Sequence, residues 1–150
     1  MLVAELATPN VQTCARTESV ARAARIMWDN DCGCVPVLDE QGIVVGMITD
    51  RDICMAAYMQ RKPLTEITVD SAASHGVVTV RGTDAVDSAE AVMRKHRIRR
   101  VPVVDARGKP TGILAMSDLV RCSTSAMDAH DGLADASIVE TLAAICAQPE

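Results

Sequence analysis

The stretch Val101 to Leu119, VPVVDARGKPTGILAMSDL, sets the pattern for the whole chain. Two apolar runs flank a tight polar turn, which predicts a strand, a turn, a second strand and the start of an acidic helix. Shifted back by 66 residues, it falls on Val35 to Ile53, VPVLDEQGIVVGMITDRDI, and seven of the nineteen positions are identical. The same shift pairs Thr13 with Thr79. A single register without gaps indicates an internal duplication.

Each repeat is predicted to contain the elements β-α-β-β-α. In the first repeat, Thr17 is expected to cap a helix that runs to about Asp29. Neither repeat is large enough to close a core alone, so we expect an α/β (α+β) fold in which the two repeats pack with pseudo-twofold symmetry. The expected strands are 11–15, 34–38 and 43–49 in the first repeat and, in the second, one beginning at Val77, 101–104, and one that follows the turn 105–108 and ends at Ala115. After the helix capped by Thr17, the expected helices are 50–60, 83–96 and one beginning at Met116.

Three segments are predicted from these elements. Residues 1–63 form the first repeat with a lead-in, 64–124 the second repeat with a linker strand, and 125–150 a polar linker and a short helix. Ser137 to Glu140 has the form of a capping box that opens this last helix. Its apolar stripe, Ile138, Leu142 and Ile145, is expected to dock on the body of the protein or on a partner.

Composition excludes several classes of protein. The 150 residues are 49% hydrophobic and 23% charged, which is typical of soluble globular chains. No apolar run is long enough to span a membrane and the N-terminus carries no export signal, so we expect a cytoplasmic protein with free thiols at its six cysteines. A net charge of −5 and only two aromatic residues argue against nucleic acid as a partner.

No catalytic or metal-binding motif is visible. The sequence has no phosphate-binding Walker loop, no dinucleotide fingerprint and no nucleophile elbow, so an enzyme is not expected. His75, His96 and His130 share no ligand spacing. The pair Cys32 and Cys34 lacks the second pair that a metal site needs, and no metal is predicted.

The repeated unit, with Val-Pro-Val, Asp, Gly and a closing Gly-x-x-(Thr/Ser)-x-x-Asp, resembles the cystathionine-β-synthase (CBS) domain. Two such units in tandem look like a Bateman module, and the resemblance covers about residues 8–124. The C-terminal stretch is similar to the tail of small stand-alone bacterial two-CBS proteins. The resemblance implies an adenosine-containing ligand (AMP, ADP, ATP, S-adenosylmethionine, sometimes NAD) held between the repeats, with no required cofactor. It also implies a homodimer and an unknown downstream protein partner.

The resemblance also implies site residues. Asp52 and Asp118 would accept the ribose hydroxyls, and Thr49 would reach phosphate or ribose. Ala115 removes the hydroxyl from the second repeat, where Ser117 is a substitute donor. Residues that would line the adenine slot are Thr13, Val35, Val77, Thr79 and Val101. Arg51, Arg99 and Arg100 are candidates for gripping phosphate.

Alternatives remain open for these residues. Thr49 and Asp52 also form a helix capping box that needs no ligand, whereas Asp118 persists without a capping partner, which favours a ligand contact. The basic stretch 94–100 is either a solvated helix end, a phosphate grip or a nucleic-acid patch. We therefore expect a non-enzymatic sensor of an adenosyl ligand. The alternative is a stress-response or redox-linked interaction protein with vestigial pockets.

Overall fold

The computed structural model describes residues 1–125 and 135–147. Within them the chain forms two four-stranded sheets, each in its own packing unit. This confirms the expected mixed α/β class. The polar linker expected after residue 124 falls largely on 126–134, which lie outside the described residues.

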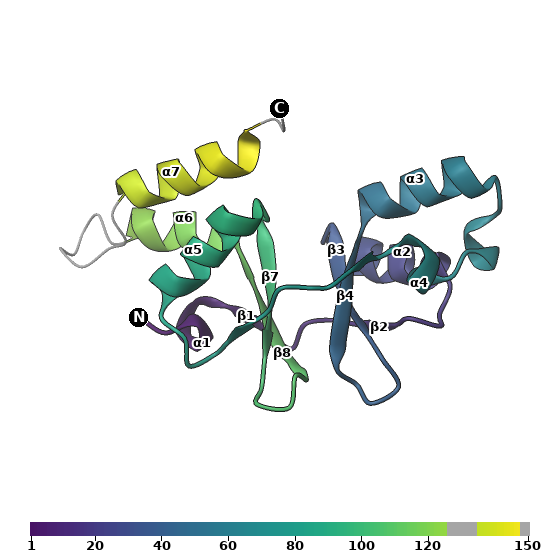
Figure 1. Ribbon diagram of the computed structural model, residues 1–150, viewed down its shortest axis with the longest axis horizontal. Coiled ribbons are helices and arrows are strands. Elements are labelled where there is room, and N and C mark those ends of the chain that lie inside the picture. The colour runs from purple at the N-terminus through teal and green to yellow at the C-terminus, as the bar shows by residue number, and fades with distance from the viewer. Residues whose placement is uncertain (126–134, 148–150) are drawn as a thin grey trace. The chain divides into compact units, whose positions relative to one another are not determined.

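The first unit comprises residues 10–77 and 107–110. Its sheet has the order β2-β3-β4-β5, in which β2 is parallel to β3 and the other neighbours are antiparallel (Figure 1). The elements are β2 (Cys14–Ala15), α2 (Val20–Asp29), β3 (Cys34–Leu38), β4 (Val44–Thr49), α3 (Asp50–Gln60), the 3₁₀ turn η1 (Leu64–Glu66), α4 (Val69–Ala72) and β5 (Ser74–His75).

The second unit comprises residues 1–9, 78–106 and 111–150. Its sheet has the order β1-β8-β7-β6, which repeats the connectivity of the first sheet. The elements are α1 (Val3–Leu6), β1 (Thr8–Pro9), β6 (Val80–Arg81), α5 (Val86–His96), β7 (Arg100–Val104), β8 (Pro110–Ala115), α6 (Met116–Ser125) and α7 (Asp135–Cys146).

The first helix of each repeat begins two or three residues later than the sequence predicts. The helix expected from Thr17 starts at Val20, with Ser19 as its N-cap, and the helix expected from residue 83 starts at Val86. In the turn before the first helix, the Glu18 carboxylate accepts the Ala15 N–H at 2.7 Å. The second repeat makes the same turn between Asp84 and Arg81, at 2.8 Å. The acidic side chain therefore closes a turn before the helix begins.

The segment before each repeat packs in the other unit. β1 pairs with β8 through Thr8 and Ile113, and β5 pairs with β4 through Ser74 and Met47. In place of the linker strand expected from residue 64, the chain forms η1, α4 and the two-residue β5. The divisions 1–63 and 64–124 thus describe sequence repeats, whereas the packing units exchange these short segments.

Gly46 and Gly112, two of the identical positions, permit this edge pairing. A Cβ atom on Gly46 would lie 2.5 Å from the Ser74 carbonyl oxygen, and one on Gly112 would lie 2.7 Å from the Thr8 carbonyl oxygen. Both distances are too short for any side chain. The glycines are therefore required by the close approach of the edge strand.

Each unit encloses its own apolar core. The sequence predicts that one repeat cannot close a core alone, and the exchanged segments supply the missing residues. They add Val69 and Ala73 to the first core and Val3 to the second. Val3 and Val69 are equivalent under the 66-residue shift, and both are fully buried. The first core also contains Cys14, Val20, Ile26, Val37 and Ile48, and the second Val86, Met93, Val103, Leu114 and Leu119.

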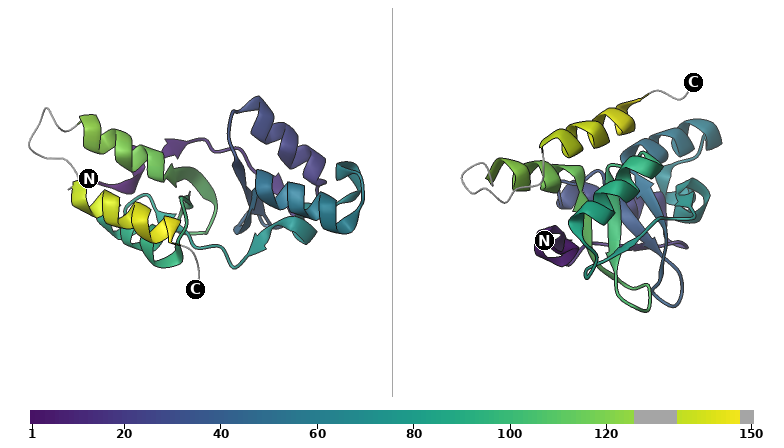
Figure 2. Two further views of the ribbon diagram at one scale, coloured as in Figure 1. Left: turned by 90° about the horizontal axis from the view of Figure 1, so that it is seen from above. Right: turned by 60° about the vertical axis from the view of Figure 1, so that its left-hand side comes forward.

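The C-terminal helix α7 docks on the second unit, which settles the alternatives for its apolar stripe. The helix lies beside α5 and α6 (Figure 2). Its side chains Ile138, Leu142 and Ile145 pack against the second core. The Ser137 hydroxyl, expected in a capping box, instead donates to the buried Glu90 carboxylate at 2.7 Å, and the helix starts earlier, at Asp135. Among the described residues no helix is long and apolar enough to cross a membrane.

Replacing either edge glycine should destabilise the fold. Gly46→Ala and Gly112→Ala each force a Cβ into a backbone carbonyl, and overpacking of this kind costs roughly 1–3 kcal/mol. Urea unfolding should show a lower midpoint for both variants. Gly33→Ala is the matched control, because its Cβ would lie 3.4 Å from the nearest atom of the Asp50 side chain. An unchanged midpoint for Gly46→Ala would contradict the close approach.

Cys14 should resist thiol reagents. Burial in the first core, with a smaller contribution from Glu18, raises the pKa of the Cys14 thiol to about 12. At pH 8 roughly one thiol in ten thousand is then the reactive thiolate. Mass spectrometry after N-ethylmaleimide treatment should find the exposed Cys32 and Cys54 modified and Cys14 modified only after denaturation. Equal rates at Cys14 and Cys32 in the native protein would show that the core opens readily.

Candidate functional site

The start of α3 in the first unit carries a complete capping box. Thr49 is the N-cap, and its hydroxyl accepts the Asp52 N–H at 3.1 Å. The Asp52 carboxylate accepts from the Thr49 backbone N–H at 2.8 Å and from the Thr49 hydroxyl at 2.7 Å. Both bonds go to Oδ2, and among the described residues Oδ1 of this half-buried carboxylate receives no hydrogen bond. One oxygen of Asp52 is thus left for an external donor.

The equivalent carboxylate in the second unit is already committed. Asp118 is only 3% exposed, and its Oδ2 accepts the Ala115 N–H at 2.7 Å. Its Oδ1 is ion-paired with the guanidinium of Arg121, one turn along α6. Asp118 therefore does cap α6, contrary to the prediction, because this half of a capping box needs only the Ala115 backbone N–H and no hydroxyl. Arg121 was missed at the sequence level, although its i+3 spacing was the available signal.

Strand register places three of the predicted residues at one end of the first sheet. Cys34 pairs with Thr49, so the start of β3 lies beside the end of β4. Cys14 pairs in parallel with Val37, which sets Thr13 level with Pro36. Thr13, Val35 and Thr49 therefore share the sheet end from which α3 begins.

Val77 does not join this group. β5 runs antiparallel to β4, with Ser74 opposite Met47 and His75 opposite Gly46, so the chain leads away from Thr49 as it approaches Val77. Arg51, in contrast, lies in the exposed first turn of α3.

The first valine of each Val-Pro-Val sequence is a core residue. Val35 and Val101 are fully buried in the first and second cores. Their side chains hold the sheets together, so any ligand contact at these positions involves the main chain.

In the second unit the predicted residues surround the start of α6. The Met116 N–H donates to the Arg99 carbonyl at 2.8 Å, which joins the beginning of α6 to the beginning of β7. Thr79 directly precedes β6, and Ser117 is exposed in the first turn of α6. The Arg99 guanidinium lies 4.0 Å from the Cys146 sulfur of α7, and both Arg99 and Arg100 are exposed.

The first unit thus presents the Asp52 carboxylate and Arg51 at a helix start beside a sheet end, whereas the Asp118 carboxylate of the second unit is buried and ion-paired. A carboxylate oxygen accepts hydrogen bonds from hydroxyl pairs, whereas an arginine and helical N–H groups favour an anion. Such a combination suits a molecule with both a sugar diol and a negatively charged group. No group of His, Cys, Asp and Glu in the described part of the chain could hold a metal ion.

Comparison with known proteins gives a consistent result. The family model described as the CBS domain matches residues 3–59 and 67–125. The uncharacterized protein YlbB of Bacillus subtilis is 33% identical over 136 residues, which cover 90% of each chain.

Two solved structures share the fold and were determined with ligands. The CBS domain pair of protein MJ0100, in complex with 5-methylthioadenosine and S-adenosyl-L-methionine, is 30% identical, with a TM-score of 0.72, and the match covers 81% of this chain and 94% of that one. CBSX2 in complex with AMP is 25% identical, with a TM-score of 0.72 and coverage of 84% and 98%.

The family model alone spans most of the chain, and its two matches coincide with the two 66-residue repeats found in the sequence. The protein belongs to the CBS domain family, and it contains a tandem pair of these domains.

Proposed function

We propose that this CBS pair is a non-enzymatic regulatory module that binds an adenosine-containing ligand at the first repeat. The observation that carries the proposal is the Asp52 carboxylate, which is held rigidly by Thr49 and keeps one oxygen for a ligand. The MJ0100 and CBSX2 pairs, crystallised with adenosyl compounds, support this ligand class.

Each of the first-repeat residues contacts a different part of the ligand. Asp52 Oδ1 accepts the ribose hydroxyls, and Thr49 fixes the carboxylate in place. Arg51, in the exposed first turn of α3, stabilises the negative charge of a phosphate. Thr13 and the main chain of Val35 border the base. The base is held by aliphatic groups and main chain, since the whole chain has one Trp and one Tyr.

The second repeat is proposed as the weaker site. Ligand binding there requires Asp118 Oδ1 to exchange the Arg121 guanidinium for ribose hydroxyls. Thr79, Arg100, Ser117 and the main chain of Val101 would complete it. Val77 and Arg99 are also proposed to border the second site, as the resemblance implies.

Occupancy becomes regulation only through differential affinity. A ligand shifts the protein between two conformations by the difference in its binding free energy to each. The protein is proposed to be a homodimer, and a downstream protein partner would recognise the change in its conformation. Thermal-shift and calorimetric titrations with the candidate adenosyl compounds would identify the one that binds.

Asp52→Asn should abolish most of the ligand binding. A hydrogen bond to a charged acceptor contributes about 1.5–3 kcal/mol, so we expect a loss of affinity of roughly 10- to 100-fold. Thermal shift and calorimetry with AMP, ADP, ATP and S-adenosylmethionine would measure it. Asp87→Asn is the matched control, because Asp87 is an exposed acid in the first turn of α5. The proposal fails if none of the four compounds stabilises the wild type, or if Asp52→Asn binds as the control does.

Arg121→Ala should open the second site. The substitution removes the cation paired with Asp118 and frees Oδ1 for ribose. Calorimetry should then show an increase from about one ligand per chain toward two, while the first-site affinity stays unchanged. An unaltered stoichiometry at saturating ligand would show that the ion pair is not what limits this site.

A further inference from the structure

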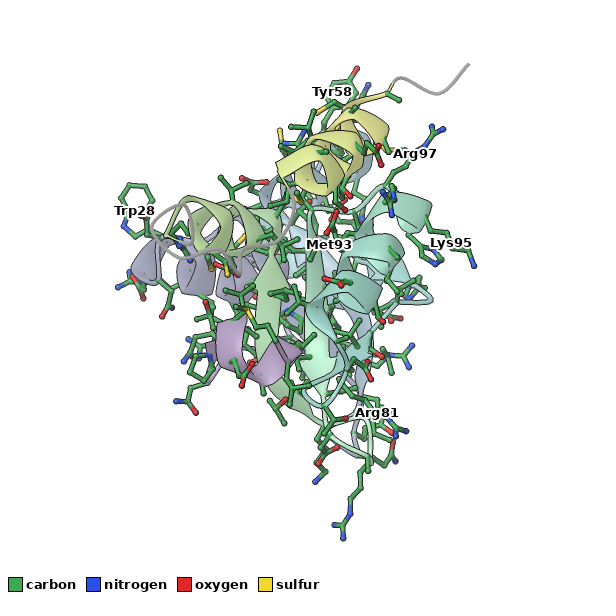
Figure 3. All side chains as sticks on the ribbon, turned by 90° about the vertical axis from the view of Figure 1, so that its left-hand side faces the viewer. Trp28, Tyr58, Arg81, Met93, Lys95 and Arg97 are labelled. Carbon is green, nitrogen blue, oxygen red and sulfur yellow. The ribbon has the colours of Figure 1, made fainter. Side chains whose placement is uncertain are left out.

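The first unit contains a groove that shares no lining residue with the proposed ligand site. This α2–α3 groove, of about 450 Å³, opens between the end of α2 and the start of α3. Its floor is apolar, formed by the buried Met27 and Ile53, and its rim carries the exposed carboxylates of Asp31 and Asp50. Trp28 borders the groove and projects outward, with 84% of its surface exposed (Figure 3). Exposed apolar surface rimmed by charged groups marks sites of protein–protein contact.

The internal duplication shows what the same position contains in the second unit. Under the 66-residue shift, Met27 and Ile53 correspond to Met93 and Leu119. Met93 and Leu119 are fully buried, in the core cluster against which the apolar side chains of α7 pack. A helix therefore covers this position in the second unit, whereas in the first unit the same position is an open groove.

The charge at the rim differs between the two repeats. Trp28 corresponds to Arg94, whose guanidinium pairs with Glu140 of α7 at 3.2 Å. In the first unit an indole takes the place of this cation, and the carboxylates of Asp31 and Asp50 line the same groove. An aromatic face and carboxylates both attract a positive charge. A helix in the α2–α3 groove should therefore carry Lys or Arg where α7 carries Glu140.

A second position of the groove is apolar in the first repeat and charged in the second. Ala24, which also lines the groove, corresponds to the buried Glu90. The Glu90 carboxylate accepts hydrogen bonds from the hydroxyls of Ser137 and Thr141 of α7, at 2.7 Å and 2.6 Å. The methyl group of Ala24 is no acceptor, and a hydroxyl buried without a partner is unfavourable. A helix in the α2–α3 groove should therefore carry apolar residues where α7 carries Ser137 and Thr141.

We propose that the α2–α3 groove binds an amphipathic helix of a different protein, with a basic residue beside Trp28 and apolar residues against Ala24. The α7 helix of a second copy does not suit the groove, because its Glu140 would face the carboxylates of Asp31 and Asp50. The inference rests on the proposed function only in that it gives a chemistry to the downstream partner. It is otherwise independent of ligand binding, because the groove contains none of the residues proposed to hold the ligand.

Two synthetic peptides test the groove on the full chain. One has the α7 sequence, residues 135–147, and the other has the same sequence with Ser137→Ala, Glu140→Arg and Thr141→Val. In calorimetry without any adenosyl compound, the redesigned peptide should bind at least about tenfold more tightly, because it meets both requirements of the groove. Its binding should also reduce acrylamide quenching of the fluorescence of Trp28, the only tryptophan in the chain.

Variants of the full chain make the test specific to the groove. Trp28→Arg introduces the residue of the second repeat and should weaken binding of the redesigned peptide by at least about tenfold. Combining it with Ala24→Glu should reverse the preference, so that the unchanged α7 peptide binds more tightly. Tyr58→Arg is the matched control, because Tyr58 is an aromatic residue of α3 that is 77% exposed and does not line the groove. Circular dichroism confirms that each variant is folded.

Three results would overturn the proposal. The wild type could bind both peptides equally or neither of them, or Trp28→Arg could bind the redesigned peptide as Tyr58→Arg does. A fall in Trp28 quenching with protein concentration alone would show that a second copy occupies the groove. A chain that binds an adenosyl compound but neither peptide refutes the groove alone, whereas one that binds only the redesigned peptide refutes the ligand proposal alone.

Discussion

The pairing of a two-residue edge strand across a glycine is the contact on which the rest of the structure depends. β5 can approach β4 only because Gly46 has no side chain, and β1 approaches β8 over Gly112 for the same reason. Each edge strand brings a buried valine with it, Val69 or Val3, and so completes a core that the repeat alone leaves open. Sheet, core and helix starts are all positioned by this closure.

The same backbone frame carries two different electrostatic arrangements. In the first unit, the Thr49 N–H and hydroxyl both donate to one oxygen of Asp52, and the other oxygen receives no hydrogen bond from the described residues. In the second, Ala115 uses one oxygen of Asp118 through its N–H, and Arg121 takes the other. Duplicated positions have thus diverged, so that one carboxylate oxygen stays open in the first repeat while both are occupied in the second. The two repeats also differ in charge at another equivalent position, where the first has Asp31 and the second has Arg97.

Much of the fold could be predicted from the sequence because the strand–turn–strand units carry strong periodicity. The exchanged segments could not be read this way, since four helical and two extended residues show no period. The 66-residue shift does extend to them, from Val3 to Val69 and from Thr8 to Ser74, and was the available signal. The role of Glu90 depends on Ser137, which is distant in sequence, and the capping by Asp118 depends on a backbone N–H, so composition does not reveal either one.

The exchange of edge segments has a consequence for the order in which the chain is made. During synthesis Thr8 leaves the ribosome long before its partner Ile113 exists, whereas Ser74 follows its partner Met47 closely. Residues 2–9 are equivalent in register to 68–75, so for part of this time the nascent first sheet has an open edge that fits the wrong segment. A nascent chain in which β1 had paired with β4 would have to exchange β1 for β5 to reach the native pairing.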